Sequence, residues 1–316
     1  MRAVVSLGSV NVDHAVRLDD ATLAELRARY DWFPAAGETV TVESVPDDVR
    51  DFQWQRSLGG KGANQAVAAA RAGADSRLLG AVGDDHREYA VLDSLASDGV
   101  TVDDVSIAEG PTGAAFVFLD EAAENRIVVQ PGANAAVDTA YVRRHRETVR
   151  AADVFLLQNE VPVEPVEALL GWLDGVPDRP TVVLDPAPAA GAAPLLAHES
   201  VDLVTPNAVE AAALGDAVDR FEGTVVEKRG PDPVVVTREE ADGGGFTISP
   251  PTVGVRDTTG AGDVFAGFLA ARLAAGDGLR EAVTVATHAA SLSVREDGVQ
   301  EATPTLAVVR EWLDGR

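Results

Sequence analysis

Short apolar runs alternate with longer segments of helical periodicity along most of the chain. The runs are rich in Val, Ile and Leu, which predicts buried β-strands, and they cover residues 3–7, 77–82, 102–107, 154–158, 181–184, 203–205, 234–237 and 246–248. The segments between them repeat apolar residues every three to four positions, which predicts helices, and they cover residues 59–73, 87–96, 139–149, 163–173, 208–214, 280–294 and 306–313. The alternation predicts an α/β fold with a central, mostly parallel sheet and helices on both faces.

Two parts of the chain depart from this alternation. One holds a short predicted helix and two predicted strands, and the other a predicted hairpin; these elements cover residues 22–30, 40–45, 52–58, 113–119 and 125–130. We expect them to form a small β-sheet lid, made of about residues 12–58 and 108–130, on a single 316-residue domain. The aromatic residues of the lid can line a pocket, form a dimer face or fill the lid core, and the core is favoured; they are Trp32, Phe33, Phe52 and Trp54.

The stretch 256–270, RDTTGAGDVFAGFLA, combines a glycine turn with the start of a helix. The β-prone residues 252–255 before it predict a strand. Free N–H groups and the positive end of the dipole make a helix N-terminus favourable for an anion, and Gly260, Ala261 and Gly262 let the backbone approach one closely. A carboxylate at Asp263, beside a bound phosphate, suits a general base that accepts a proton from an attacking hydroxyl. The alternative is that Asp263 only caps the helix.

A second glycine loop, GGKGAN at residues 59–64, opens a long alanine-rich helix. Its backbone amides, with the side chains of Lys61 and Asn64, offer donors to a polyhydroxyl or phosphate ligand. The loop can also act as a hinge for the lid, and the two roles are compatible.

The two common phosphate-binding motifs do not fit these loops. GxxxxGK[ST] is absent, because Gly62 follows Lys61 where Ser or Thr is required. A dinucleotide fingerprint starting at Gly260 would need a third glycine where Phe265 stands, so this type of site is disfavoured.

Polar residues gather where the predicted parallel strands end. Right-handed crossovers bring the carboxyl ends of parallel strands to one edge of the sheet. The residues expected at this edge are Asn11, Asp13, Gln158, Asn159, Glu160, Asp185, Asn207, Glu210, Asp257, Thr258 and Asp263. Each alone fits a cap or a turn, but together they predict a cleft suited to a sugar and a metal-bound nucleotide.

The net charge of −25 limits the partners of the protein. Fifty-one acidic residues face 26 basic ones, and only two of the basic residues are lysines, Lys61 and Lys228. Such a surface repels nucleic acids and anionic membranes, and no apolar run is long enough to span a bilayer. The chain has no cysteine, which excludes disulfides and thiol chemistry. We expect a cytoplasmic protein without a signal peptide, adapted to a high-salt cytoplasm in which its self-repulsion is screened.

Two long motifs resemble the signatures of the ribokinase-type sugar kinases, the PfkB carbohydrate kinase family. GGKGANQAVAAARAGA is similar to the first signature and DTTGAGDVFAGFLA to the second, and NAVE matches the N-x-x-E motif. GSVNVD, LQNE and PAPA look most like the ribose-specific members. The resemblance runs nearly end to end and implies an α/β sandwich with a lid, ATP as phosphoryl donor, Mg²⁺ and a monovalent cation such as K⁺. It also implies that a pentose, foremost D-ribose, is phosphorylated at its primary hydroxyl.

The resemblance assigns a role to individual residues. Asp263 is the catalytic base, and Gly260, Ala261 and Gly262 form the anion hole for the transferring phosphoryl group. The sugar-binding residues are Asn11, Asp13, Gly60, Lys61, Asn64, Glu160 and Asp263. The nucleotide-binding residues are Asp185, Asn207, Thr237, Gly262 and His288. Glu210 serves Mg²⁺ indirectly, and the residues around the monovalent cation are Asp257, Thr259 and Gly298.

Three features depart from the family pattern. Ribokinases usually carry Asn where Asp185 stands. The T-x-G-x-x-G nucleotide loop has the altered sequence TREEAD at residues 237–242, with glycines only from Gly243. Residues 21–33 look like an insertion in the lid, which can change the acceptor to a nucleoside, fructose or keto-deoxygluconate. A non-catalytic sugar-binding protein is a further alternative. Aromatic lids often pair in this family, so a homodimer through the lid is a hypothesis.

Overall fold

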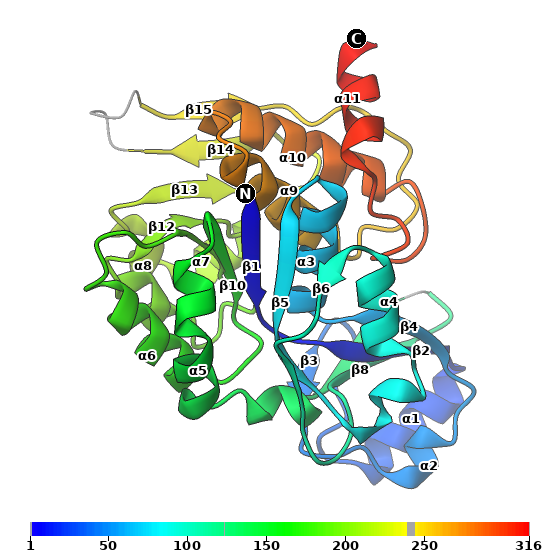
Figure 1. The fold of residues 1–316 in the computed structure, drawn as a ribbon. Coiled ribbons are helices and arrows are strands. Elements are labelled where there is room, and N and C mark those ends of the chain that lie inside the picture. The colour runs from blue at the N-terminus through cyan, green and yellow to red at the C-terminus, as the bar shows by residue number, and fades with distance from the viewer. Residues whose placement is uncertain (1, 123, 239–243, 316) are drawn as a thin grey trace.

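A ten-stranded sheet runs through the computed structural model, which describes residues 2–122, 124–238 and 244–315. The strand order is β15-β14-β13-β12-β11-β10-β1-β5-β6, with β7 paired to β5 (Figure 1). The strands from β13 to β6 are parallel, while β14 and β15 run antiparallel at one end. The bounds are β1 Ala3–Leu7, β5 Asp75–Val82, β6 Val100–Thr101, β7 Val105–Ile107, β10 Val154–Gln158, β11 Thr181–Asp185, β12 Val201–Val204, β13 Thr224–Glu227, β14 Val234–Thr237 and β15 Phe246–Ile248.

Helices cover both faces of this sheet, as the alternation predicts. Neighbouring residues of one strand point to opposite faces, and Leu156 and Leu157 of β10 accordingly belong to two different hydrophobic cores. Helices α3, α9 and α10 lie on the first core, and α5 and α6 on the second. The helix bounds are α3 Lys61–Arg71, α4 Val91–Ser97, α5 Thr139–Arg150, α6 Val163–Leu173, α7 Ala208–Leu214, α8 Asp216–Asp219, α9 Ala261–Ala274, α10 Leu279–Ser293 and α11 Leu306–Asp314, with short 3₁₀ turns at Asp84–Arg87, Gly132–Ala136 and Ala193–Ala197. Among the described residues, every helix is too short or too polar to span a lipid bilayer.

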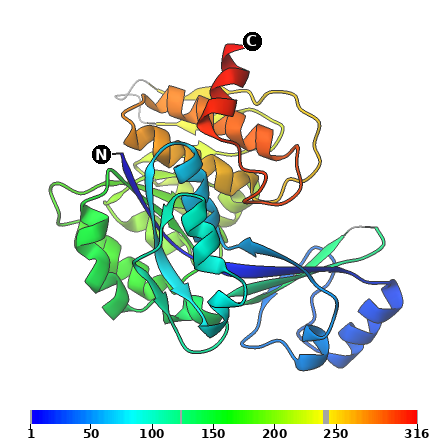
Figure 2. The ribbon, with the colours of Figure 1, turned by 45° about the vertical axis from the view of Figure 1, so that its right-hand side comes forward.

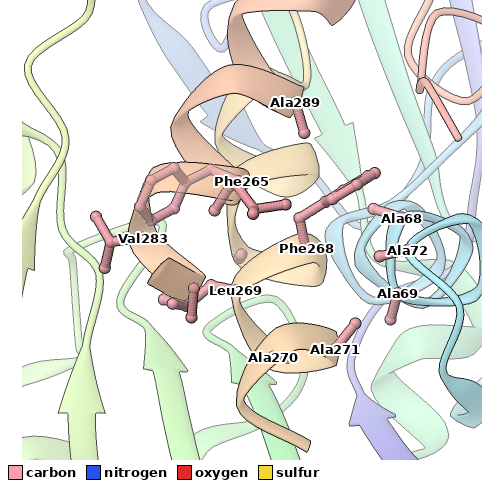
Figure 3. Close-up of a cluster of buried hydrophobic side chains, with 14 of the residues drawn as sticks. Ala68, Ala69, Ala72, Phe265, Phe268, Leu269, Ala270, Ala271, Val283 and Ala289 are labelled. Carbon is pink, nitrogen blue, oxygen red and sulfur yellow. The ribbon is translucent and has the colours of Figure 1, made fainter. Parts of the chain in front are cut away.

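Helix α9 is packed between α3, α10 and the sheet. Figure 3 shows Phe265 and Phe268 of α9 among alanines of α3 and α10. A Cβ on Gly267 of α9 would lie 2.5 Å from both the Cβ of Ala68 and the carbonyl oxygen of Gln65. Small residues therefore allow the two helices that follow the glycine loops to approach each other closely.

Replacing Gly267 with alanine should destabilise the fold by about 1–3 kcal/mol, because the added methyl group has no space between α3 and α9. Gly171 of α6 is the matched control, since a Cβ there meets only His198 Cε1 at 3.7 Å. Gly171→Ala should stabilise the protein by about 0.5–1 kcal/mol through helix propensity. Urea unfolding of both variants measures the difference, and equal stabilities would contradict the packing argument.

A second, five-stranded sheet projects from one side of the α/β body (Figure 2). Its strand order is β3-β9-β8-β2-β4, with bounds Thr39–Thr41, Asn125–Gln130, Ala114–Leu119, Asn11–Arg17 and Gln55–Gly59. Strand β2 pairs in parallel with β8 and antiparallel with β4. We call these five strands the small sheet. Since β2 starts directly after the segment that leaves β1, the small sheet stands at the carboxyl edge of the large one.

The aromatic residues of the expected lid segments pack together into a hydrophobic core on the small sheet, as favoured from the sequence. Phe33, Phe116 and Phe118 are buried, and Trp54 packs on Phe116 and Phe118 with ring centroids 5.3 Å apart. Helices α1 (Asp20–Arg29) and α2 (Asp47–Arg50) supply Leu23, Leu26 and Val49 to this core. The segment expected to be an insertion therefore covers one face of the small sheet.

The structure corrects four expectations about the elements. The strand expected at 252–255 is absent, because Pro250 and Pro251 cannot donate ladder hydrogen bonds and Val255 is 65% exposed. Strand β13 was not predicted. The helix expected at 87–96 is instead a 3₁₀ turn followed by α4, and the strand expected at 102–107 is instead the two short strands β6 and β7.

Candidate active site

The first turn of α9 carries a buried carboxylate. Asp263 is 5% exposed, its Oδ2 accepts a hydrogen bond of 3.0 Å from Asn64 Nδ2, and its Oδ1 accepts one of 3.0 Å from Gln65 Nε2. Gln300 Nε2 donates to Asn64 Oδ1 at 3.0 Å. This contact turns the amide nitrogen of Asn64 towards Asp263. Both oxygens of Asp263 thus have fixed positions and keep further lone pairs for a ligand.

The glycine turn in front of α9 has the backbone shape of an anion site. Gly260 precedes the helix with φ 73°, in the left-handed region that favours glycine. A Cβ on Gly260 would lie 2.1 Å from Val299 Cγ1, so a larger residue does not fit. Ala261 and Gly262 form the first turn, whose N–H groups have no partner within the helix; the Ala261 N–H makes a long bond of 3.3 Å to the carbonyl oxygen of Thr258 in the preceding turn. These donors and the helix dipole provide positive potential beside Asp263.

Gln65 links Asp263 to a second buried carboxylate. Its Nε2 also donates to Asp185 Oδ2 at 2.8 Å, and its Oε1 accepts from Gln158 Nε2 at 2.5 Å. Gln65 was not among the site residues predicted from the sequence. The available signal was its helical spacing, because a residue four positions after Lys61 lies on the same face of the helix.

Glu160 closes the glycine loop at the start of α3. Its Oε2 accepts hydrogen bonds from Ser9 Oγ at 2.5 Å and from the backbone N–H of Lys61 at 3.1 Å. Gly60 has φ 87°, and a Cβ there would lie 2.7 Å from the carbonyl oxygen of Ser9. Burial raises the pKa of Glu160, while Lys61 and the hydrogen bond from Ser9 oppose the rise. Ser9 was not among the predicted site residues.

Asn11 and Asp13 lie on one face of β2, two residues apart. Asn11 Oδ1 accepts a hydrogen bond of 2.8 Å from Asn134 Nδ2. Burial raises the pKa of Asp13 to about 7, and the charges of Glu160 and Asp263 add to the rise, while a backbone hydrogen bond from Ala115 and the charge of Lys61 oppose it. Asp13 Oδ1 is buried and accepts no hydrogen bond from the described residues. A buried acceptor of this kind is suited to a hydroxyl group of a ligand.

Lys61 balances the carboxylates of the site. Its pKa is raised chiefly by Asp263, against the effect of burial, and Glu160, Asp185 and Glu210 raise it further. Lys61 is therefore a permanent cation between carboxylates that come from four different parts of the chain.

Lys228, the second lysine of the chain, lies at the same edge. It follows β13, its backbone N–H donates to the carbonyl of Pro206 at 2.9 Å, and its backbone forms a parallel bridge with Asn207. Its Nζ lies 2.9 Å from Asp185 Oδ1, and the two side chains are 13% and 2% exposed. A Cβ on Gly262 would lie 3.4 Å from this ammonium nitrogen. Lys228 was not predicted as a site residue, because the strand that leads to it was not predicted.

Asn207 and Glu210 form a capping box at the start of α7. Asn207 Oδ1 accepts from the Glu210 N–H at 2.8 Å, and Glu210 Oε2 accepts from the Asn207 N–H at 2.8 Å. The box uses only one carboxylate oxygen of Glu210, so Oε1 can accept a further hydrogen bond.

The loop before α9 gathers backbone and carboxylate oxygens. Asp257 Oδ1 accepts from the Thr259 N–H at 2.9 Å. Burial opposes ionisation of Asp257, but hydrogen bonds from Thr259 and from the backbone of Gly298 hold its pKa below the usual range. Gly298 has φ 88°. An ionised carboxylate beside turn carbonyls fits a hard monovalent cation.

The structure does not bring Thr237 to this edge. Strand β14 runs antiparallel, so Thr237 pairs with Val225 near the start of β13, at the opposite edge of the sheet. The position expected for Thr237 is therefore wrong. Residues 239–242 of the nucleotide loop expected at 237–242 lie outside the described residues. The loop that does follow a parallel strand at the site is 228–233, KRGPDP. His288 lies in α10, buried, with Nδ1 2.9 Å from the carbonyl oxygen of Thr284.

The fold and the site together define an α/β phosphotransferase. A buried carboxylate stands at an open helix N-terminus, with two lysines and an unpaired acceptor beside it. The chain belongs to the pfkB family of carbohydrate kinases, whose family model matches residues 33–306. It is therefore an enzyme that transfers a phosphoryl group to a sugar hydroxyl.

Ribokinases are among the relatives that this chain resembles over nearly its whole length. The chain is 35% identical to the ribokinase of Bacillus subtilis, over 99% of this chain and 100% of that protein. It is 32% identical to the ribokinase of Schizosaccharomyces pombe, over 97% and 96% of the two chains.

Solved structures of ribokinases share the fold. The ribokinase of Thermotoga maritima matches with a TM-score of 0.79 and 28% identity, over 99% of each chain. The ribokinase of Arabidopsis thaliana, solved with ribose and ATP, matches with a TM-score of 0.78 and 27% identity over 98% of each chain. These matches agree with the fold class expected from the sequence.

Proposed function

We propose that the protein is an ATP-dependent ribokinase that converts D-ribose to ribose 5-phosphate. The observation that carries the proposal is Asp263, a buried carboxylate at the N-terminus of α9. Its charge acts on Asp13 and Glu160, and Lys228 lies against Gly262 in the same helix turn. The ribose and ATP named for the Arabidopsis structure support this choice of substrates.

Asp263 acts as the general base in this proposal. One of its oxygens accepts the proton of the ribose 5-hydroxyl while the hydroxyl oxygen attacks the γ-phosphorus of ATP and ADP leaves. Asn64 and Gln65 hold the carboxylate, so no reorganisation is needed at the moment of reaction. Backbone N–H groups of Gly260, Ala261 and Gly262 receive the negative charge of the transferring group.

The sugar lies under the small sheet, which we propose acts as the lid. Donors and acceptors for the ribose hydroxyls come from β2 and from the glycine loop with its neighbours. They are Asn11, Asp13, Lys61, Asn64, Glu160 and the backbone of Gly60. A sugar without aromatic groups suits this face, because the aromatic side chains of the small sheet pack on its other face. A nucleoside acceptor would have used them for stacking.

The proposal also assigns residues that bind the nucleotide. They are Asp185, Asn207, Glu210, Gly262 and His288. The loop 228–233 replaces the loop after Thr237 as the segment that contacts the nucleotide. Mg²⁺ would neutralise phosphate charge, with Glu210 as its indirect ligand. A monovalent cation such as K⁺ would be held by Asp257, Thr259 and the Gly298 backbone.

The test is ADP release from ATP and Mg²⁺ in molar KCl across a panel of acceptors. We expect turnover with D-ribose at least tenfold higher in kcat/KM than with deoxyribose, fructose, keto-deoxygluconate or adenosine. If another compound were preferred, the proposed mechanism would stand, but ribose would be wrong as the acceptor. Ribose binding without ADP release from any acceptor would leave the non-catalytic sugar-binding protein.

The same proposal places the enzyme in a high-salt cytoplasm, supported by the net charge of −25. A melting temperature equal in dilute buffer and in molar KCl would count against it. A homodimer through the lid also stays a prediction, although α1 and α2 already cover the aromatic face that was expected to pair. Light scattering in high salt measures the mass.

A further inference from the structure

Lys228 lies beside the proposed site of phosphoryl transfer. Its ammonium nitrogen is 3.4 Å from where a Cβ on Gly262 would stand, so it lies against the first turn of α9. Its backbone is joined to Pro206 and Asn207, on the nucleotide side. The side chain is 13% exposed and thus reaches into the site and not into bulk solvent.

Asp185 fixes the position of this ammonium group. Its Oδ1 lies 2.9 Å from Lys228 Nζ and its Oδ2 accepts from Gln65 at 2.8 Å. The side chain of Asp185 is 2% exposed, so the carboxylate is an anchor held inside the sheet edge. An ammonium group has three donors, and the ion pair with Asp185 uses one of them. The remaining donors of Lys228 can bind an anion at Gly262.

From this arrangement, and resting on the proposed kinase activity, we infer that Lys228 contacts the phosphoryl group in transit between ATP and the sugar. Its charge acts together with the helix N–H groups at Gly262, because both meet the equatorial oxygens on which negative charge is spread. Asp185 is then a positioning residue, which orients Lys228 and, through Gln65, stands in one hydrogen-bonded chain with Asp263. The acceptor proton still goes to Asp263.

The competing explanation is structural: Lys228 only neutralises the buried charge of Asp185. A double-mutant cycle separates the two explanations. The variants are Lys228→Met, Asp185→Asn and the two combined, with Lys228→Arg as the conservative change. Arg220→Met is the control for loss of one positive charge, since the Arg220–Asp216 pair is fully on the surface with side chains 81% and 83% exposed.

We expect Lys228→Met to lower kcat for ribose phosphorylation 10- to 100-fold in the wild-type background. In the Asp185→Asn background the loss should be smaller but still at least about fivefold, because Lys228 is then less well positioned. Lys228→Arg should recover part of this loss, and Arg220→Met should stay within twofold of wild type. A loss that disappears when Asp185 is also replaced would overturn the inference and leave Lys228 as a counter-ion. The double variant removes both charges of the buried pair and leaves no unpaired charge inside the protein. Misfolding caused by an unpaired charge therefore cannot explain a loss of activity in it.

Binding measured by calorimetry gives a second readout that needs no turnover. ADP with aluminium fluoride mimics the transferring phosphoryl group, and Lys228→Met should weaken its binding at least tenfold while ADP alone binds within threefold of wild type. Equal losses for both probes would contradict contact with the phosphoryl group. A wild-type protein that binds both probes but phosphorylates no acceptor would refute the proposed function and not the role of Lys228.

Discussion

Asp263→Asn should lower kcat for ribose phosphorylation about 10³-fold, the effect expected when a positioned general base is removed. Asparagine has nearly the same shape, and its Oδ1 can still accept one of the two hydrogen bonds that Asn64 and Gln65 now donate, while its NH2 group faces the other donor. The substitution adds no bulk and does not touch the other residues proposed to bind the sugar. KM for ribose should therefore change by less than about fivefold. The loss then belongs to the transition state and not to substrate binding.

The control for this variant is another acid in the first turn of a neighbouring helix. Glu281 has that position in α10 and is exposed. Glu281→Gln removes the same favourable interaction with a helix dipole, worth about 0.3–1 kcal/mol of stability, and should leave kcat unchanged. If Asp263→Asn keeps kcat within tenfold of wild type and only lowers the melting temperature, Asp263 is a capping residue and the base must be sought elsewhere.

Local sequence patterns located individual candidate residues, and the topology of a parallel sheet predicted that these residues meet. The residues 11, 13, 61, 64, 160 and 263 follow glycine turns or strand ends, and the parallel-sheet rule alone brings such positions to one edge. Asp263 and Asn64 are separated by 199 residues, yet they meet at 3.0 Å. Periodicity of short segments, together with the parallel-sheet rule, was therefore sufficient to predict most strands of the large sheet and the meeting of these six residues at its edge.

The errors around β13 and β14 have one physical origin, the direction of a strand. Strand β13 is four residues long and follows a short helix, so its pattern is weak, and β14 was taken as the next parallel strand. Pairing direction is decided by contacts between distant residues, and the apolar run Val234–Thr237 looks the same in either direction. One missed strand therefore moved the nucleotide loop to Thr237 and hid Lys228. Gln65 was missed for another reason, because a buried glutamine in an alanine-rich helix has no apolar period to mark it.

Asp13→Asn should raise KM for ribose about 100-fold with little change in kcat, because one charged hydrogen bond of about 3 kcal/mol is lost equally from the ground and transition states. The pH dependence follows from the pKa of about 7 in the free protein. Wild-type kcat/KM should fall as the pH drops below 7, since the protonated carboxyl is a poorer acceptor. In Asp13→Asn the fall of kcat/KM at low pH should be smaller. The remaining fall should come from Glu160, because burial raises its pKa as well. Identical profiles would contradict the assignment of Asp13 to the sugar.

The same substitution should make the unliganded protein more stable at high pH. Asp13 has a pKa of about 7 in the folded protein against an ordinary value of 3.8, so between these values the folded state binds more protons than the unfolded state. The free energy of unfolding of wild type therefore falls as the pH rises through this window, by at most about 4 kcal/mol. A neutral asparagine does not have this dependence.

In urea unfolding, the stability gap in favour of Asp13→Asn should thus widen by about 2–3 kcal/mol from pH 5 to pH 8. Asp19→Asn is the control, because Asp19 is exposed and its pKa is lowered by the hydrogen bond from Thr22, so it is ionised throughout this range. If the stability gap between Asp13→Asn and wild type stayed constant with pH, the carboxylate of Asp13 in the wild type would be solvated. A widening gap together with the loss of ribose affinity would show that the protein keeps an unfavourable buried charge at Asp13 because the sugar, when bound, satisfies it.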